Sequence, residues 1–191
     1  MSTRYLTEIA QVPEEIERWT EIVVSSGARS YLEVGSKFGG SLWHVASRLP
    51  PGSRVVSIDM PRGTKLWAES EPSLKGCIAA LKAMGHDARV FWGSSTDEGI
   101  VAAIEKLGPF DACFLDGNHT MPYVTADFGH FGTISRIVGF HDIGWRRAPT
   151  WQGTRIDVPD WWEQHKNSYR HEEIKLCPTG KNNGIGVFWR H

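Results

Sequence analysis

The chain has 191 residues, a formal net charge of −1 and 40% hydrophobic residues, which is enough sequence for one domain with a substantial core. The near-zero charge excludes the broad basic surface of a nucleic-acid-binding protein. No run of about 18 apolar residues is present, which excludes a membrane-spanning helix, and residues 1–12 do not have the layout of a secretory signal. We therefore expect a single domain over residues 1–191 that binds neither nucleic acid nor membrane.

The first half of the chain has a pattern in which helices alternate with strands. Pro13 and a one-sided row of apolar residues indicate an N-terminal helix over about 13–25. The expected elements that follow are a strand at 30–34, a helix at 40–49, a strand at 55–58, a helix at 72–84 and a strand at 88–92. Proline and glycine residues end the two later helices.

The second half continues the alternation. Ser95 and Glu98 have the spacing of a capping box, which predicts a helix that runs to Leu107. The expected elements after it are a strand at 112–115, a helix at about 122–131, a strand at 137–140, a short helix at about 160–167, and two final strands, at Ile174 and at 184–189, paired as an antiparallel hairpin. This order indicates βαβ units and a mostly parallel sheet. Residues 144–159 lack periodicity, as functional loops often do.

The cysteines bear on the cellular compartment. Cys77, Cys113 and Cys177 are odd in number and form no CxxC pair. Reduced thiols in a reducing compartment are the simplest interpretation. The sequence therefore predicts a cytoplasmic location.

The strand at 30–34 leads into a segment typical of nucleotide-type cofactor sites. Its acid and glycine, Glu33 and Gly35, precede a small-residue loop to Gly39 that opens a helix. Glycines let the backbone approach a ligand, and helix N–H groups face its anionic part. Asp59 ends the next strand, 20 residues after Gly39, where a carboxylate can hold a ribose diol. The alternative is a plain strand–turn–helix corner with a capping aspartate. The G-x-x-x-G spacing disfavours a nicotinamide dinucleotide.

Acidic and imidazole groups end two further strands. Asp116 follows the strand at 112–115, and His141 and Asp142 follow the strand at 137–140. Neighbouring parallel strands would bring these groups together, where they could hold Mg²⁺ or Ca²⁺, or, through the imidazole, Mn²⁺ or Fe²⁺. The alternative is that both aspartates hold backbone N–H groups. His119, and second His141, could act as a general base at neutral pH, although a lone histidine is more often structural.

Four segments together resemble the class I S-adenosylmethionine (SAM)-dependent methyltransferases. They are EVGSKFG at 33–39, the strand end at Asp59, LDGNH at 115–119 and FHDI at 140–143. Within that class the chain is similar to the metal-dependent branch of macrolide-sugar O-methyltransferases and cephalosporin-hydroxylase-like proteins. The segment NGIGV at 183–187 also resembles the last strand of that branch. The resemblance spans roughly residues 28 to 190. It implies a Rossmann-like three-layer αβα sandwich with a seven-stranded, mostly parallel sheet and an antiparallel last strand.

The resemblance also implies a site. The loop would wrap the methionine end of SAM with Glu33 near its ammonium group, Asp59 would bind the ribose, and residues 92–94 would lie at the adenine, where Trp92 either flanks the base or packs in the core. The implied cofactor-binding residues are Glu33, Gly35, Ser36, Gly39, Ser41, Asp59, Trp92, Gly93, Ser94 and Asp116. The implied metal ligands are Asp116, His141 and Asp142, for Mg²⁺ or else Mn²⁺ or Fe²⁺. The D-x-x-H spacing carries the general base in macrolide-sugar enzymes, which points to His119, with His141 second.

Two features depart from the branch. The position of His141 is often Glu or Asp in metal-binding members, and the turn before the fifth strand, at 131–136, is shorter than the usual Pro-Gly-Gly turn. We therefore expect a tighter turn and an altered pocket wall.

The resemblance predicts a SAM-dependent transferase that methylates the hydroxyl of a small molecule such as a sugar, macrolide or phenol. The alternatives are a catalytically silent SAM-binding partner protein, a nicotinamide-dependent oxidoreductase and a cephalosporin-hydroxylase-like oxygenase. In the substrate-side loop at 144–159, the aromatic residues with Arg146, Arg147 and Arg155 suit a flat or anionic substrate group. They suit a lid or a homo-oligomer contact equally well.

Overall fold

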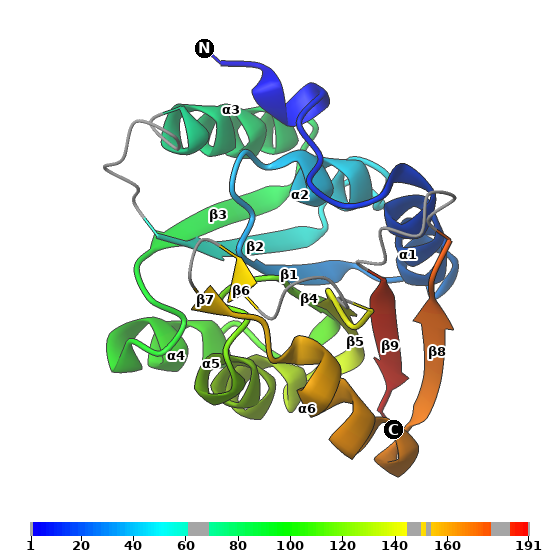
Figure 1. Cartoon of the computed structure of the whole chain (residues 1–191). Helices are drawn as coiled ribbons and strands as arrows, with labels where there is room; N and C mark the ends of the chain where they lie inside the picture. The colour runs from blue at the N-terminus through cyan, green and yellow to red at the C-terminus, as the bar shows by residue number, and fades with distance from the viewer. Residues whose placement is uncertain (1, 61–68, 145–149, 152–153, 177–183, 191) are drawn as a thin grey trace.

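A seven-stranded sheet forms the middle layer of the computed structural model, which describes residues 2–60, 69–144, 150–151, 154–176 and 184–190. The strand order is β3-β2-β1-β4-β5-β9-β8 (Figure 1). The strands are β1 Ser30–Val34, β2 Arg54–Asp59, β3 Asp87–Trp92, β4 Phe110–Leu115, β5 Ser135–His141, β8 Arg170–Ile174 and β9 Ile185–Trp189. All neighbouring pairs from β3 to β5 are parallel, and β9 is antiparallel to both β5 and β8. The predicted sheet is thus confirmed, including its antiparallel last strand.

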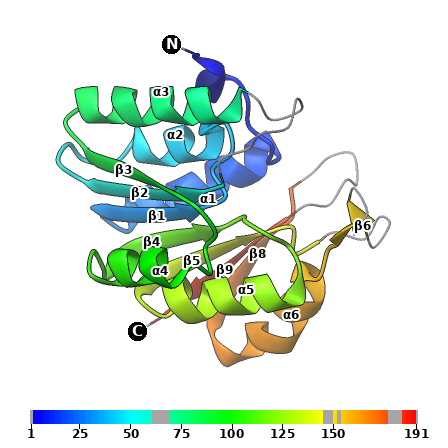
Figure 2. The same ribbon diagram turned by 90° about the vertical axis from the view of Figure 1, so that its left-hand side faces the viewer.

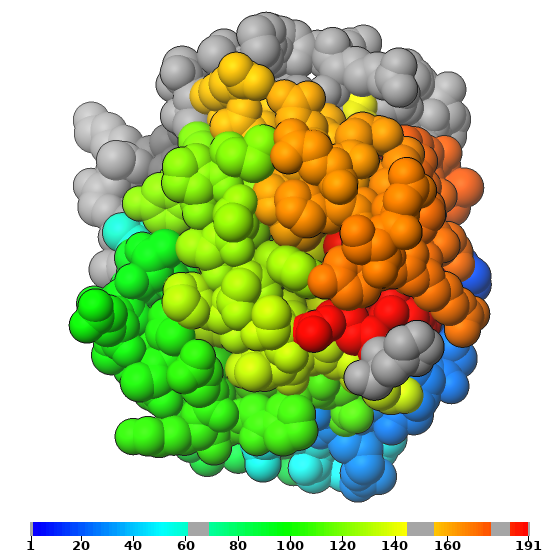
Figure 3. Space-filling model, turned by 90° about the horizontal axis from the view of Figure 1, so that it is seen from below, coloured from blue at the N-terminus to red at the C-terminus, as the bar shows by residue number. Residues whose placement is uncertain are grey.

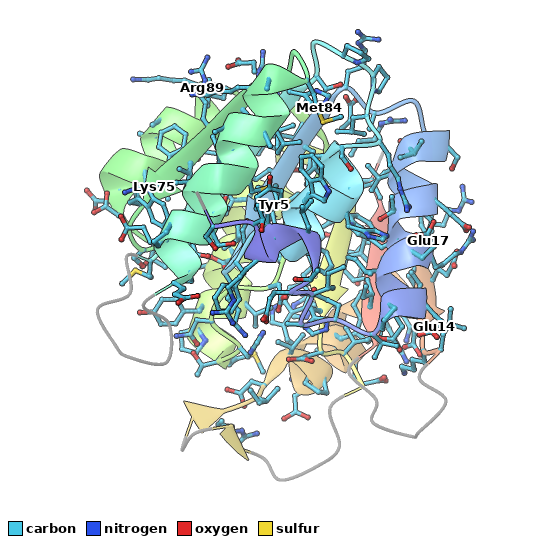
Figure 4. The ribbon with its side chains drawn as sticks, turned by 90° about the horizontal axis from the view of Figure 1, so that it is seen from above. Tyr5, Glu14, Glu17, Lys75, Met84 and Arg89 are labelled. Carbon is cyan, nitrogen blue, oxygen red and sulfur yellow. The ribbon has the colours of Figure 1, made fainter. Side chains whose placement is uncertain are left out.

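Helices cover both faces of this sheet, which completes the predicted αβα sandwich (Figures 1 and 2). The helices are α1 Pro13–Ser25, α2 Gly40–Ala46, α3 Ser70–Ala83, α4 Glu98–Glu105, α5 Met121–Asp127 and α6 Val158–His165. The helices α1, α2 and α3 lie on one face with the short 3₁₀ turn Arg4–Leu6 (Figure 4). The other face is covered by α4, α5 and α6 (Figure 3). Each face has its own apolar core.

Two glycines in paired strands make room for buried tryptophans. A Cβ on Gly139 of β5 would lie 3.0 Å from the ring of Trp19, and one on Gly186 of β9 would lie 2.6 Å from the ring of Trp162. Both rings are fully buried, and their large apolar areas contribute strongly to the two cores. Trp161 is buried as well, so these two tryptophans of the 144–162 region serve the core.

Several local predictions need correction. The helix expected at 40–49 ends at Ala46. The α-helix expected at 122–131 ends at Asp127, and a π-helical turn, Phe128–Gly132, follows it. The capping box at Ser95 and Glu98 is wrong, because the side chain of Asp97 accepts from the N–H groups of the first turn of α4. Aspartate is a strong N-cap residue in its own right, and α4 ends at Glu105 instead of Leu107.

The region predicted as an aperiodic loop contains a short β-hairpin. Its strands are β6 Thr150–Trp151 and β7 Thr154–Arg155, and they form a sheet of their own. The following helix begins at Val158, two residues earlier than predicted.

Cys77 and Cys113 are buried free thiols, whereas Cys177 lies outside the described residues. Among the helices that the structure describes, none has the length and apolarity to cross a bilayer.

Candidate functional site

A cavity of about 580 Å³ lies at the carboxyl ends of the parallel strands. It lies at the end of β1, from which the chain adds β2 and β3 on one side and β4 and β5 on the other. Open α/β sheets bind ligands at this switch point. The predicted site residues on its lining are Gly35, Ser36, Ser41, Asp59, Gly93, Ser94, Asp116, His119, His141 and Asp142. Three predicted residues, Glu33, Gly39 and Trp92, are not part of the lining.

The turn after β1 brings the backbone of one strand against the next. Gly35 has φ +87°, and a Cβ placed on it would lie only 2.1 Å from the carbonyl oxygen of Asp116. Glycine is therefore required at this position both by conformation and by space. Gly39, at φ +88°, precedes α2, and a Cβ on it would lie 2.9 Å from Cys77 Cβ. Gly39 thus allows the turn to pack against Cys77, outside the cavity lining.

Asp59 is held at the rim of the cavity by backbone groups. Its carboxylate accepts hydrogen bonds from the N–H of Met60, at 2.7 Å, and from the N–H of Lys37. Lys37 lies in the loop after β1 and has φ 52°. These bonds tie the end of β2 to the glycine loop, so the carboxylate predicted for the ribose and the loop predicted for the methionine end form one wall.

Glu33 lies behind that wall instead of in the cavity. It is fully buried, and its carboxylate accepts hydrogen bonds from Ser41 Oγ at 2.8 Å and from the Tyr31 hydroxyl at 2.9 Å. Burial raises the pKa of Glu33 to about 7, against the lowering effect of these hydrogen bonds. Glu33 acts on the cavity through Ser41, which does line it. Trp92 is half-buried and packs against the core on the side of α3.

We expect Glu33 to make the protein less stable as the pH rises. Its pKa is about 7 in the folded chain and about 4.5 when unfolded, so between these values the folded state keeps a proton that the unfolded state loses. The free energy of unfolding is therefore up to about 3 kcal/mol lower above pH 7 than at pH 4.5. Urea unfolding at pH 5 and pH 8 measures it, with Glu33→Gln as the non-titrating control. A difference between the two proteins that does not change with pH contradicts the assignment.

Two carboxylates and two imidazoles converge on one side of the cavity. Asp116 Oδ1 lies 3.1 Å from His119 Nε2 and 3.0 Å from His141 Nδ1. Asp142 lies 3.3 Å from His141 Nδ1 and 3.6 Å from His119 Nε2. One ligand atom from each residue lies within 4.8 Å of all the others. The ends of β4 and β5 therefore meet as predicted, and the structure adds His119 to the same cluster. We call these four residues the Asp/His cluster.

Within the Asp/His cluster, the charge of Asp116 and the charges of the two histidines stabilise one another. Burial raises the pKa of the Asp116 carboxyl, but the two histidines outweigh burial and lower it below its usual range. Burial lowers the pKa of His141, but Asp116 and Asp142 outweigh this and raise it to about 9. The pKa of His119 is also raised, chiefly by its hydrogen bond to Asp116, against burial. A cation that binds here must therefore displace protons.

The chain before α1 supplies lining residues that no sequence pattern predicts. Glu8, Ile9, Ala10 and Gln11 line the cavity. Gln11 is 6% exposed and its Nε2 donates to Asp116 Oδ2. This segment has no motif that would mark it as part of a site. In the structure Gly40 makes room for this segment, because a Cβ there would lie 2.1 Å from the carbonyl oxygen of Glu8.

The described part of the loop at 144–159 is tied to His119. The N–H of Asp157 donates to the carbonyl oxygen of His119 at 2.7 Å, and Asp157 Oδ2 accepts from the N–H of Met121 at 2.8 Å. Arg155 forms ion pairs with Asp157 and Asp160. These ion pairs link Arg155 to the start of α6. The predicted loop residues 145–149 lie outside the described residues.

Comparison with known proteins identifies the fold. No protein-family profile matches the chain, and no curated protein matches its sequence. Solved structures do match. The O-methyltransferase TomG of tomaymycin synthesis from Streptomyces achromogenes, in complex with SAM, is 18% identical, with a TM-score of 0.73 and coverage of 99% of this chain and 87% of TomG.

A second match is an O-methyltransferase from Bacillus cereus in complex with SAH, the demethylated product of SAM. It is 19% identical, with a TM-score of 0.72 and coverage of 97% of this chain and 84% of that enzyme. The chain is thus an α/β protein of the Rossmann-like class, with its cavity at the switch point of the sheet. More narrowly, it has the fold of the class I O-methyltransferases.

Proposed function

We propose that this protein is a SAM-dependent O-methyltransferase that acts on a hydroxylated small molecule. The observation that supports it most is the single cavity that joins the glycine loop, Asp59 and the Asp/His cluster. A cavity of about 580 Å³ is within the range of small-molecule sites. The two neighbours solved with SAM and SAH have the same fold.

In this proposal each wall has a task. The backbone between Gly35 and Gly39 lies against the methionine end of SAM, Asp59 accepts hydrogen bonds from the ribose hydroxyls, and Gly93 and Ser94 face the adenine. The acceptor hydroxyl loses its proton to His119, and its oxygen forms a bond to the methyl carbon as the bond to sulfur breaks, which leaves SAH. Such a displacement depends mainly on alignment of the two reactants and on proton removal.

The Asp/His cluster fits a divalent cation. Its donors are two carboxylates and two imidazoles, and Asp142 Oδ1 is buried without a hydrogen bond from any described residue. Carboxylates suit Mg²⁺, and imidazoles favour Mn²⁺ or Fe²⁺. A bound cation would orient the acceptor hydroxyl and lower its pKa. Asp116, His141 and Asp142 would hold it, and His119 is close enough to be either a fourth ligand or the base.

Cofactor binding tests the proposal directly. We expect SAH, but not NAD, to bind the wild-type protein in calorimetry, and Asp59→Ala to weaken SAH binding by about 1–3 kcal/mol through loss of charge-assisted hydrogen bonds. Asp87→Ala removes an exposed carboxylate outside the cavity lining and is the matched control. Equal SAH affinity in Asp59→Ala and the control contradicts the ribose role. Binding of NAD instead of SAH rejects the proposed function.

One observation favours a second candidate, the hydroxylase-like oxygenase. Two imidazoles with carboxylates are also the donor set of non-haem Fe²⁺ oxygenases. Incubation with Fe²⁺, O₂ and a reductant, followed by a search for oxygenated products, separates the candidates. A silent SAM-binding partner would bind SAH without methyl transfer to any phenol or sugar tested, and Asp116→Ala would not alter its function.

A further inference from the structure

Glu15 is a buried carboxylate that the proposed reaction does not use. It lies in the first turn of α1, is 0% exposed and does not line the cavity. Its two oxygens accept hydrogen bonds from the N–H groups of Leu176 and Gly184, each at 3.0 Å. Burial of a carboxylate costs several kcal/mol unless its lone pairs are used. Two bonds leave part of the capacity of a carboxylate, about four acceptor positions, for another donor.

His141 has a second buried group whose hydrogen-bonding capacity is unused within the described part of the chain. His141 directs Nδ1 toward Asp116 and Asp142, whereas its Nε2 is buried and has no hydrogen-bond partner among the described residues. His141 is paired across the sheet with Ile185, the residue that follows Gly184. Glu15 thus contacts the backbone one residue from the partner of His141. Asp116 and Asp142 are the main charges that raise the pKa of His141, and Glu15 adds a smaller contribution in the same direction.

We propose that Glu15 is a positioning residue for His141. One buried water would link the Glu15 carboxylate to the Nε2–H of His141 and thereby keep Nδ1 directed at Asp116 and Asp142. The effect that we expect of Glu15 on cation binding rests on the proposed function, in which His141 is one of the ligands. The reason is the chemistry of imidazole, in which a hydrogen bond at one ring nitrogen fixes the ring and leaves the other nitrogen as the ligand. A buried water that bridges two such groups is common in proteins.

The first experiment needs no variant. The protein is labelled with ¹⁵N-histidine, and the ring nitrogens of His141 are observed by NMR without metal and with Zn²⁺. We expect Nε2 to carry a slowly exchanging proton in both states, with its proton resonance shifted downfield by the carboxylate. A Nε2 that loses its proton when Zn²⁺ is added, or whose proton exchanges as fast as that of exposed His171, overturns the proposal.

The second experiment tests the coupling through Mn²⁺ affinity, measured by EPR. We expect Glu15→Gln to weaken Mn²⁺ binding by about 10–100-fold, the usual effect of removing such a partner of a metal-bound histidine. Glu14→Gln is the matched control, since Glu14 is the preceding residue and lies on the exposed side of α1 (Figure 4). In a His141→Ala background, Glu15→Gln should change Mn²⁺ affinity less than threefold. Equal effects in both backgrounds mean that Glu15 only anchors the backbone of Leu176 and Gly184, and overturn the proposal.

The outcomes separate this inference from the proposed function. If the wild-type protein binds SAH and Mn²⁺ but Glu15→Gln behaves like Glu14→Gln, the proposed function survives and the role of Glu15 is rejected. If the wild-type protein binds no Mn²⁺, the metal-assisted part of the function is rejected, and the metal-free NMR spectrum still decides whether Nε2–H is held. Unfolding of Glu15→Gln in urea shows whether the variant keeps its fold.

Discussion

Replacement of His119 by alanine is expected to lower methyl transfer by about 10²–10⁴-fold and to leave SAH affinity unchanged. The size is that of a lost general base. His119 lines the cavity, and the contact of its Nε2 with Asp116 Oδ1, at 3.1 Å, fixes the orientation of the ring. Transfer of a labelled methyl group to a panel of phenols and sugars gives the rate, and calorimetry gives the SAH affinity.

Two further measurements show how His119 acts. The loss in His119→Ala should shrink at high pH, where the acceptor hydroxyl ionises without a base. His171→Ala removes an exposed imidazole from the edge strand β8 and should have the wild-type rate. If Mn²⁺ affinity falls in parallel with the rate, His119 is a metal ligand rather than the base. A rate near that of the wild type places the base elsewhere, with His141 as the next candidate.

Gly35→Ala is expected to have the largest effect on the fold. The added Cβ would lie 2.1 Å from the carbonyl oxygen of Asp116, so the chain must separate just beyond the last paired residues of β1 and β4, Val34 and Leu115. Gly27→Ala is the matched control, because Gly27 also has a positive φ, +73°, and a Cβ there meets nothing within 4 Å. The control carries only the cost of a left-handed conformation, about 1–2 kcal/mol.

The difference between the two variants isolates the clash. We expect urea unfolding to show Gly35→Ala at least about 2 kcal/mol less stable than Gly27→Ala. Because the shift moves Asp116, both SAH and Mn²⁺ binding should weaken in Gly35→Ala only. If the two variants have the same stability and the same affinities, the close contact between the turn and Asp116 is not required.

The sequence predicted the sheet and the groups at its strand ends because both follow local rules. Apolar runs define the parallel strands, and a residue that directly ends such a strand, such as Asp59 or Asp116, must lie at the carboxyl edge. The strand β1, predicted at 30–34, has these bounds in the structure. The same logic brought Asp116 and Asp142 together correctly. Helix ends were less accurate, as at α2 and α4, because competing caps decide them.

What the sequence did not indicate depends on contacts between distant segments. Gln11 reaches Asp116 across 105 residues and Glu15 reaches Gly184 across 169, and no spacing rule links such positions. The family resemblance placed Glu33 at the ligand, but its side chain points to the buried face with Tyr31. Alternation along a strand separates the two faces. It does not show which face belongs to the ligand.

The placement of β9 between β5 and β8 has a consequence for how the protein is made. The strand that flanks His141 is translated after every other strand it touches. Until β9 is synthesised, the edges of β5 and β8 that pair with it stay unpaired. Unpaired strand edges are surfaces through which nascent chains aggregate. Ribosome-bound chains that stop before residue 185 should accordingly recruit chaperones more strongly than chains released after it.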